Sequence, residues 1–220
     1  MGNSVPLDFN KVYPYICDNS LRETPLLQLL RKQTAELPNA SMQIPPEQGQ
    51  LLSLITRLTG ARHAIEIGTF TGYSSLCIAE ALPNDGKLIC CDISDEYTTI
   101  AKKYWREAGV EHKIELKLGP AIETLSTLLK QQQKETFDLI FIDADKTSYI
   151  NYYELSLELL KPNGLIIFDN MLWGGKVTDE NERDEDTVAL REMNRLLHSD
   201  QRVDISLLTV ADGITLARKR

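Results

Sequence analysis

Short apolar runs that alternate with helical patterns limit how this chain can fold more than any other feature. The runs have the length of strands and occupy residues 63–68, 87–93, 114–119, 137–144 and 164–170. Their apolar residues are continuous rather than alternating, which indicates strands covered on both faces. Segments with helical spacing separate them, for example residues 97–109 and 121–133. This order predicts an α/β fold with a doubly wound, mostly parallel sheet.

The N-terminal part of the chain departs from this alternation. Residues 26–37 have helical spacing and follow Thr24-Pro25, and residues 48–60 follow Pro45-Pro46-Glu47. Both segments place proline where the first turn of a helix accepts it. The sequence therefore predicts a helical preface, residues 1–60, before an α/β core at residues 61–220. With 220 residues and 42% hydrophobic composition, the chain is most simply one domain.

The C-terminal part predicts a different pairing from the rest of the sheet. Residues 203–210 and 213–219 are two further strand-like segments. They are joined by Ala211-Asp212-Gly213, and Asp-Gly is a strong hairpin signal. We therefore expect the last two strands to be antiparallel to each other.

Charge and cysteine content narrow the setting and the partners. The formal net charge is -8, which argues against nucleic acid and anionic membranes because both bind basic surfaces. No apolar run approaches the roughly 20 residues that span a bilayer, and the first 15 residues lack the order of a secretory signal. The four cysteines show no metal-binding spacing, so reduced thiols in the cytoplasm are expected, and they are Cys17, Cys77, Cys90 and Cys91.

A glycine-rich turn follows the first predicted strand. Gly68 and Gly72 stand between the apolar run 63–68 and the helical pattern of residues 73–82. Such strand-to-helix turns often let a backbone approach a ligand closely. The spacing is neither the dinucleotide fingerprint nor a P-loop, and no lysine follows Gly72. A ligand other than pyrophosphate is therefore expected at both glycines.

Carboxylates stand at the ends of most of the predicted parallel strands, where open sheets bind their ligands. Asp92 lies 24 residues after Gly68, close to the spacing at which an acid binds ribose hydroxyls. The glycine turn and Asp92 together suit a nucleoside with little phosphate. They suit a nicotinamide dinucleotide as well, so an oxidoreductase remains an alternative at this point.

Asp143 and Asp169 end the fourth and fifth predicted strands. If those strands are neighbours, the two carboxylates lie about 5 Å apart and repel by about 3 kcal/mol at an effective dielectric near 20. A shared proton, a basic side chain or a cation must offset this repulsion. Asn170 adds a neutral oxygen, and three such ligands with open positions suit Mg²⁺. A hydrogen-bonded strand end without any metal is the alternative.

Six segments together resemble one family of enzymes, and they are "EIGTFTGYSS", "CCDIS", "GPA", "FIDADKTSYINYY", "GLIIFDNMLWGGKV" and "VADGITLARK". In this order they resemble the caffeoyl-CoA O-methyltransferase family of class I S-adenosylmethionine-dependent, cation-dependent methyltransferases, which is similar to catechol O-methyltransferase. The resemblance runs from about residue 20 to the C-terminus. It implies a Rossmann-like methyltransferase fold with a seven-stranded sheet, a catechol-type acceptor and a homodimer.

The resemblance also implies roles for individual residues. The cofactor-binding residues would be Glu66, Gly68, Thr69, Ser74, Asp92, Ala121 and Asp143. The divalent cation, Mg²⁺ or another such as Mn²⁺ or Ca²⁺, would bind Asp143, Asp169 and Asn170. Lys146 would be the general base, and Trp173 would form an apolar wall for the acceptor ring.

Two departures from the family pattern affect the acceptor and the cofactor. Ile44 stands where relatives offer the cofactor a hydroxyl group, so it is left out of the predicted site. The segment 179–186 carries six acids and one arginine and is interpreted as a solvated loop near the acceptor. Its charge predicts that free catechols are better acceptors than a polyanionic coenzyme A thioester. A nucleoside-binding regulatory protein without activity is the remaining alternative.

Overall fold

The computed structural model describes residues 9–220, and the side chains from residue 11 onward. Residues 1–8 lie outside this range, so the expectation that the N-terminus carries no secretory signal is not tested. Across the described residues, no helix is long and apolar enough to cross a membrane. All four cysteines are free of disulfide bonds. Cys77, Cys90 and Cys91 are buried, and Cys17 is partly buried.

The strands form one seven-stranded sheet in the order β3-β2-β1-β4-β5-β7-β6. Their bounds are β1 His63–Ile67, β2 Lys87–Asp92, β3 Ile114–Leu118, β4 Phe137–Ile142, β5 Leu160–Phe168, β6 Val203–Leu208 and β7 Ile214–Lys219. Strands β1 to β5 are parallel, and β7 runs antiparallel to both β5 and β6. The predicted α/β fold with a C-terminal hairpin is confirmed, and β5 begins four residues earlier than the sequence pattern suggested.

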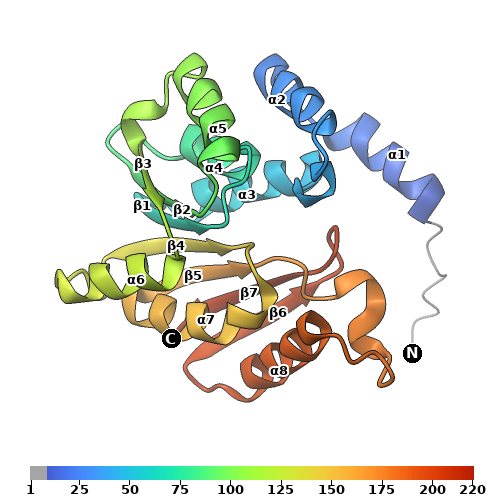
Figure 1. Cartoon of the computed structure of the whole chain (residues 1–220), viewed down its shortest axis with the longest axis vertical. Coiled ribbons are helices and arrows are strands. Elements are labelled where there is room, and N and C mark those ends of the chain that lie inside the picture. The colour runs from blue at the N-terminus through green and yellow to red at the C-terminus, as the bar shows by residue number, and fades with distance from the viewer. Residues whose placement is uncertain (1–8) are drawn as a thin grey trace.

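Helices cover both faces of the sheet (Figure 1). One face carries α2 Pro25–Ala35, α3 Pro46–Leu58, α4 Tyr73–Ala81 and α5 Asp95–Glu107, and the other carries α6 Ala121–Lys130, α7 Tyr149–Leu159 and α8 Glu185–Ser199. The first helix is α1 Phe9–Ser20, and short segments of 3-10 helix connect several elements: η1 Ala40–Met42, η2 Glu111–Lys113, η3 Lys146–Ser148 and η4 Trp173–Thr178. The layers are those of a doubly wound sheet.

Side chains of neighbouring strand residues enter opposite hydrophobic layers, which explains the continuous apolar runs. In β4, Ile140 and Ile142 pack with α6, α7 and α8, while Leu139 and Phe141 pack with α2 to α5. Cys91 and Cys90 divide in the same way and are both buried. Burial on both faces is thus what makes the strands apolar throughout.

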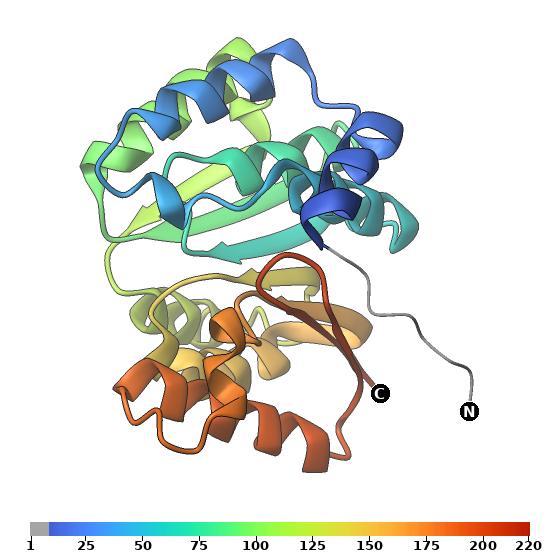
Figure 2. The ribbon, with the colours of Figure 1, turned by 90° about the vertical axis from the view of Figure 1, so that its right-hand side faces the viewer.

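The helical preface begins its helices where the sequence predicted. The Thr24 hydroxyl accepts a hydrogen bond from the Leu27 N–H of α2 at 3.3 Å, and Pro46 occupies the first turn of α3. Figure 2 shows α2 and α3 on the half of the molecule opposite α8, while α1 lies at the periphery. The last preface helix ends at Leu58 and β1 begins at His63. The division at residue 60 stays a prediction.

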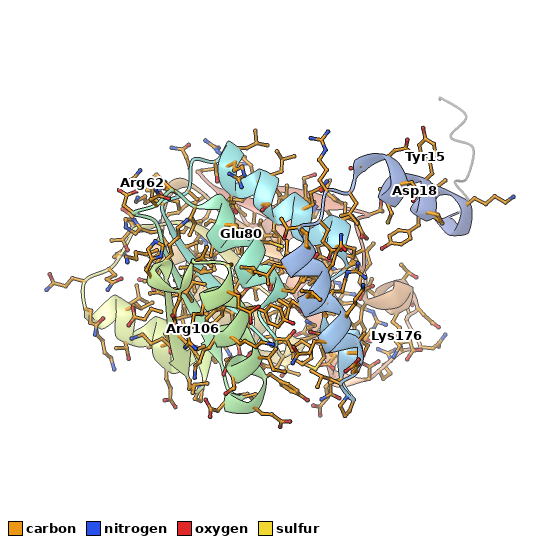
Figure 3. The ribbon with its side chains drawn as sticks, turned by 90° about the horizontal axis from the view of Figure 1, so that it is seen from above. Tyr15, Asp18, Arg62, Glu80, Arg106 and Lys176 are labelled. Atoms are coloured by element: carbon orange, nitrogen blue, oxygen red, sulfur yellow. The ribbon has the colours of Figure 1, made fainter. Side chains whose placement is uncertain are left out.

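The carboxyl ends of the parallel strands lie along one edge of the sheet. Figure 3 shows Arg62, which precedes β1, and Lys176, which follows β5, at opposite sides of the molecule. The strand order reverses between β1 and β4, so their connections leave the sheet toward opposite faces. A crevice at such a reversal is where open α/β sheets bind ligands.

Candidate active site

A cavity of about 1040 Å³ opens at the carboxyl ends of the strands. Its size is at the upper end of the usual range for small-molecule sites. The sequence-predicted site residues on its wall are Gly68, Thr69, Ser74, Asp92, Ala121, Asp143, Lys146, Asp169, Asn170 and Trp173. Glu66 is the one predicted site residue that does not line it. Residues from the preface, including Ile44 and Gln48, complete the wall.

The two glycines of the turn after β1 have different roles. Gly68 has φ +91°, and a Cβ there would lie 1.8 Å from the Asp143 carbonyl oxygen, so only glycine lets β1 and β4 meet at the cavity wall. Gly72 does not line the cavity. A Cβ on Gly72 would lie 2.5 Å from the Cβ of Ala101 in α5. The interpretation that Gly72 lets the backbone approach a ligand is therefore wrong, because its space is taken by helix packing.

Asp92, at the end of β2, organises the loop that follows β1. Its Oδ2 accepts hydrogen bonds from the backbone N–H of Thr69 at 2.9 Å and of Phe70 at 2.7 Å. Its Oδ1 accepts from the Ser94 N–H at 2.8 Å. These bonds orient the carboxylate at the cavity wall. Next to it, the Ile93 side chain is 82% exposed and lines the same cavity. A polar oxygen beside an open apolar surface suits a sugar that carries a flat ring.

Glu66 is the fourth of the five residues of β1 and is fully buried. Neither carboxylate oxygen has a hydrogen-bond partner in the described part of the chain. Burial raises the pKa of Glu66 to about 8. The side chains of Thr69 and Ser74 lie close enough to Glu66 to reduce this rise in pKa. Their positions do not meet ordinary hydrogen-bond geometry. Its predicted contact with the cofactor stays a prediction.

Asp143 and Asp169 follow directly after the paired ends of β4 and β5. Ile142 is opposite Phe168 in the parallel register, and the Asp169 N–H donates to the Ile142 carbonyl at 3.0 Å. The expectation that these two strands are neighbours is confirmed. Asp169 is 2% exposed, and burial followed by the charge of Asp143 raises its pKa well above the usual range. The two carboxylates therefore require positive charge or protons nearby.

Lys146 supplies part of that positive charge. It begins the 3-10 turn η3, is 7% exposed, and its Nζ lies 3.0 Å from Asp143 Oδ1. The same Nζ donates to the Tyr149 hydroxyl at 2.9 Å, and that hydroxyl donates to the Asp169 carbonyl at 3.2 Å. Tyr149 is fully buried, and burial raises the pKa of its hydroxyl well above 10. Tyr149 therefore positions Lys146 as a neutral hydrogen-bonding partner.

Asn170 completes the group at the end of β5. Its backbone has φ +57°, and its Nδ2 donates to Asp212 Oδ2 at 3.3 Å, so its amide oxygen is left as an acceptor. Within residues 11–220, no cluster of three or more His, Cys, Asp or Glu side chains could hold a metal ion. The predicted set has two carboxylates and one amide oxygen instead. Oxygen ligands of this kind, with room on the cavity side, fit a hard divalent cation.

Four residues in the cavity wall have left-handed backbone without being glycine. Besides Asn170, they are Phe70 with φ +49°, Trp173 with φ +49° and Ala211 with φ +48°. Bulky residues in this region are strained and gather at ligand sites. The ring of Trp173 lies 5.7 Å from the Lys146 Nζ. An aromatic wall and the amine therefore face the same part of the cavity.

Several residues at this site were missed by the sequence analysis. Gln48 of α3 donates from Nε2 to Asp169 Oδ2 at 2.7 Å. Asp212 accepts from Asn170 and from the Gly174 N–H at 2.5 Å, so the hairpin loop supports the site. A sequence signal existed for Asp212, which lies in the Asp-Gly hairpin signal, but not for Gln48, which follows Pro45-Pro46-Glu47 without a pattern that indicates a site. Tyr149 had no signal of its own.

The acidic segment 179–186 is only partly a solvated loop. Its end begins α8, where Asp184 is the N-cap and accepts from the Thr187 N–H at 3.0 Å. Asp186, in the first turn of α8, lines the cavity. Arg191 of α8 donates to the backbone carbonyls of Lys176, Val177, Asp179 and Glu182. The segment is therefore tied to α8 and has one acid at the cavity.

Comparison with known proteins agrees with this arrangement. Residues 17–220 match a protein family described as O-methyltransferase. The chain is 43% identical to a probable caffeoyl-CoA O-methyltransferase 2 of Dictyostelium discoideum, over 96% of this chain and 92% of the relative. It is 40% identical to the catechol O-methyltransferase domain-containing protein 1 of Mus musculus, over 98% of this chain and 82% of the relative.

A solved structure extends the comparison to three dimensions. The O-methyltransferase TomG of Streptomyces achromogenes, crystallised with S-adenosylmethionine, has a TM-score of 0.86 and 31% identity, covering 97% of this chain and 99% of that chain. The resemblance inferred from the six sequence segments is confirmed. The chain belongs to the O-methyltransferase family.

Proposed function

We propose that this O-methyltransferase uses S-adenosylmethionine and a divalent cation to methylate a hydroxyl group of a catechol-type small molecule. The observation that carries the proposal is the pair Asp143 and Asp169. Asp169 is buried beside a second carboxylate, and only Lys146 compensates that charge among the groups described above. A cation at this pair would bring the charges into balance and would also bind acceptor oxygens.

The half of the cavity near β1 and β2 suits the cofactor. Asp92 keeps lone pairs for ribose hydroxyls, and Ile93 and Ala121 offer apolar surface to a base. Gly68 and Thr69 border the same space, which suits the methionine end, and the preface covers it from outside. S-adenosylmethionine supplies a methyl group on a sulfonium sulfur, which is already a good leaving group. The protein is left with binding, alignment and removal of a proton.

The half near β4 and β5 suits the cation and the acceptor. Asp143, Asp169 and Asn170 would hold the cation, with Mg²⁺, Mn²⁺ and Ca²⁺ all compatible with oxygen ligands. When bound, the cation would polarise an acceptor hydroxyl and favour loss of its proton. Two adjacent hydroxyls of a catechol match a cation with open positions. Trp173 would contact the acceptor ring.

Lys146 is the proposed general base. Its Nζ is held by Asp143 and Tyr149 at the cavity wall, so the amine has one direction left from which to accept a proton. The acceptor oxygen forms a bond to the methyl carbon as the carbon–sulfur bond breaks, and that electron pair stays on sulfur. The hydroxyl proton passes to the Lys146 amine, which would be free to accept it once a cation, rather than the lysine, balances Asp143 and Asp169. The products are the methyl ether and S-adenosylhomocysteine.

The finer proposals concern acceptor, assembly and location. Relatives of this chain are named for caffeoyl-CoA and for catechol, and the acid Asp186 at the cavity favours free catechols over a coenzyme A thioester here.

A homodimer is proposed from the family resemblance, and sedimentation showing a particle of about 50 kDa, twice the chain mass of 24.9 kDa, would support it. A particle of one chain mass at micromolar concentration would refute it. A cytoplasmic location is proposed from the reduced cysteines.

The two alternatives explain fewer features of the site. A nicotinamide oxidoreductase would use Asp92 but gives no reason for Asp143 and Asp169 to lie together. A regulatory protein without activity gives no reason to hold Lys146 between Asp143 and Tyr149 at a cavity wall. Titration with NADH, followed by its ultraviolet absorbance and fluorescence, tests the first alternative directly.

The experiment that tests the proposed function is methyl transfer from labelled S-adenosylmethionine to a matched pair of acceptors. A catechol should be methylated in the presence of Mg²⁺ or Mn²⁺, and its mono-methylated counterpart should react far more slowly because it lacks two free adjacent hydroxyls. EDTA should abolish turnover, and added Mg²⁺ or Mn²⁺ should restore it. Full activity in EDTA would refute the role of the cation.

A further inference from the structure

The side chain of Gln48 is buried at the meeting point of the preface and the cation-binding half of the cavity. Gln48 belongs to α3, is 1% exposed, and lines the cavity. Its Nε2 donates to Asp169 Oδ2 at 2.7 Å across 121 residues of sequence. It is thus a direct side-chain bond between the helical preface and one of the proposed cation ligands.

The other end of the same amide is unsatisfied. Gln48 Oε1 is buried and accepts no hydrogen bond from any described residue. A buried amide oxygen without a partner costs roughly 1–3 kcal/mol, so such groups are rare unless a ligand or water completes them. Turning the amide round would not relieve this, because it would bring Oε1 against Asp169 Oδ2 and take Nε2 away from its acceptor. The free oxygen therefore calls for an external donor in the cavity.

The local sequence explains why Gln48 reaches this place. Pro45 and Pro46 fix the start of α3, and Gly49 lets the helix approach α4. A Cβ on Gly49 would lie 2.7 Å from Tyr73 Cε1 and 2.9 Å from Cys77 Sγ, so a larger residue would push α3 away. The close approach of α3 to α4 sets the position from which Gln48 reaches Asp169.

The polar residues near Gln48 in α3 bind other parts of the preface instead of the cavity. Glu47 Oε2 accepts from the Tyr13 hydroxyl at 2.9 Å. Gln50 accepts from the Arg22 N–H at 2.6 Å and donates to the Ser20 carbonyl at 2.9 Å. Glu47 and Gln50 therefore hold α1 and its connection to α2 in place. Only Gln48 is directed at the cation-binding half of the cavity.

We propose that Gln48 is a positioning residue of the cation site, orienting Asp169 through Nε2 and offering Oε1 to an O–H donor, a water molecule on the bound cation. This inference rests on the proposed function. An acceptor hydroxyl has the same O–H chemistry, and the ammonium group of the cofactor is an N–H donor; the test below separates both from the water. Groups that orient a metal ligand typically change metal affinity or activity by 10- to 100-fold when removed.

The test is calorimetric titration of the full-length enzyme, freed of metal, with Mn²⁺ and separately with S-adenosylhomocysteine. Gln48→Leu keeps the size of the side chain and removes both hydrogen bonds. Its Kd for Mn²⁺ should rise by about 10- to 100-fold, while its Kd for S-adenosylhomocysteine should stay within about threefold. Gln50→Leu is the matched control, because it is the same substitution two residues away and should leave the Mn²⁺ affinity unchanged.

The opposite outcomes are distinct from failure of the proposed function. Wild-type Mn²⁺ affinity in Gln48→Leu would overturn the inference. If only S-adenosylhomocysteine binding weakened, or only the KM for the catechol rose, the oxygen would serve the cofactor or the acceptor, and the inference would be wrong. If Gln48→Leu does not fold by circular dichroism, Gln48→Asn, whose shorter amide cannot span the distance, should show the same loss. A wild-type enzyme that binds no Mn²⁺ would overturn the cation dependence and this inference together.

Discussion

Asp92 and Asp169 are both aspartates at the carboxyl end of a parallel strand, yet their surroundings differ sharply. Asp92 is partly exposed and accepts three backbone N–H groups, from Thr69, Phe70 and Ser94. Asp169 is buried beside Asp143 and accepts from Gln48 and from the Asn170 N–H. Backbone dipoles stabilise the first carboxylate, whereas the second depends on charge supplied from outside its own loop.

This difference supports the proposed division of the cavity into a cofactor half and a cation half. The half near β1 and β2 has its carboxylate oriented by backbone N–H groups and would offer lone pairs to a neutral sugar. The half near β4 and β5 concentrates negative charge that a cation would balance. Substitutions that act on one half and spare the other therefore test whether the division is real.

The largest effect is expected for Asp169→Asn. Asparagine keeps the shape and one oxygen, but it removes a charged ligand from the proposed three-residue cation site. We expect kcat/KM at a fixed low Mn²⁺ concentration to fall by about 10³-fold, a loss of several kcal/mol of stabilisation. Thermal unfolding should show that the fold is retained. Activity within about tenfold of wild type would mean that Asp169 does not hold the cation.

Lys146→Ala is expected to have the next largest effect. It should lower kcat by about 10²-fold or more, the usual contribution of a general base, and spare cofactor affinity. Lys146→Arg is the sharper control, because arginine keeps the positive charge beside Asp143 but cannot give up its proton. Both variants should be equally impaired. An active Lys146→Arg enzyme would show that this position supplies charge rather than base catalysis.

A stability prediction concerns Glu66, which is buried in β1 and does not line the cavity. Its pKa is raised from 4.5 to about 8 by burial, so between these values the folded protein holds more protons than the unfolded chain. The contribution of Glu66 to folding stability should therefore fall as pH rises from about 5 to 8. Glu66→Gln removes this dependence and should be more stable than wild type at pH 8, on the order of a few kcal/mol, with little difference at pH 5.

Urea unfolding of the cofactor-free protein at several pH values measures this contribution. The free energies of unfolding of Glu66→Gln and wild type should diverge with rising pH. Parallel curves would show that Glu66 is ionised in the folded protein, and therefore that a partner not described above compensates it.

The smallest effect is expected for the choice of acceptor. Free catechols such as caffeic acid should have a higher kcat/KM than caffeoyl-CoA at low salt, by about tenfold, because exposed charges act weakly and are screened. Replacing Asp184, Glu185 and Asp186 by serine removes three negative charges and should therefore reduce the preference. Serine in place of Asp184 still caps α8, so the helix should be kept. Glu180→Ser, outside the cavity wall, should leave it unchanged. A higher kcat/KM for caffeoyl-CoA than for every free catechol would contradict the prediction.

The sequence predicted the sheet and the carboxylates at the strand ends because both depend on local patterns, whereas the roles of Lys146 and Trp173 came from the family resemblance. Continuous apolar runs specify strands covered on both faces, and residues at the ends of parallel strands meet at one edge whatever lies between them. The pairing of Asp143 with Asp169 followed from this rule once β4 and β5 were neighbours.

What the sequence could not predict depends on contacts between distant segments. Gln48 reaches Asp169 only because Gly49 lets α3 pack tightly on α4, and no local pattern encodes that approach. Gly72 was assigned to a ligand from the glycine-rich turn alone, because its contact with Ala101 on another helix leaves no local pattern. The acidic segment was interpreted as a solvated loop because its hydrogen bonds with Arg191 join residues 9 and 12 positions apart, which no local pattern reveals. Burial of Glu66 away from the cavity was equally invisible.

The division of the cavity is tested most directly by measuring two affinities in two variants. Calorimetry should show that Asp92→Asn binds S-adenosylhomocysteine more weakly and Mn²⁺ normally. Asp169→Asn should bind Mn²⁺ at least about tenfold more weakly and S-adenosylhomocysteine normally. Loss of both affinities in each folded variant, or normal Mn²⁺ binding by Asp169→Asn, would contradict the account.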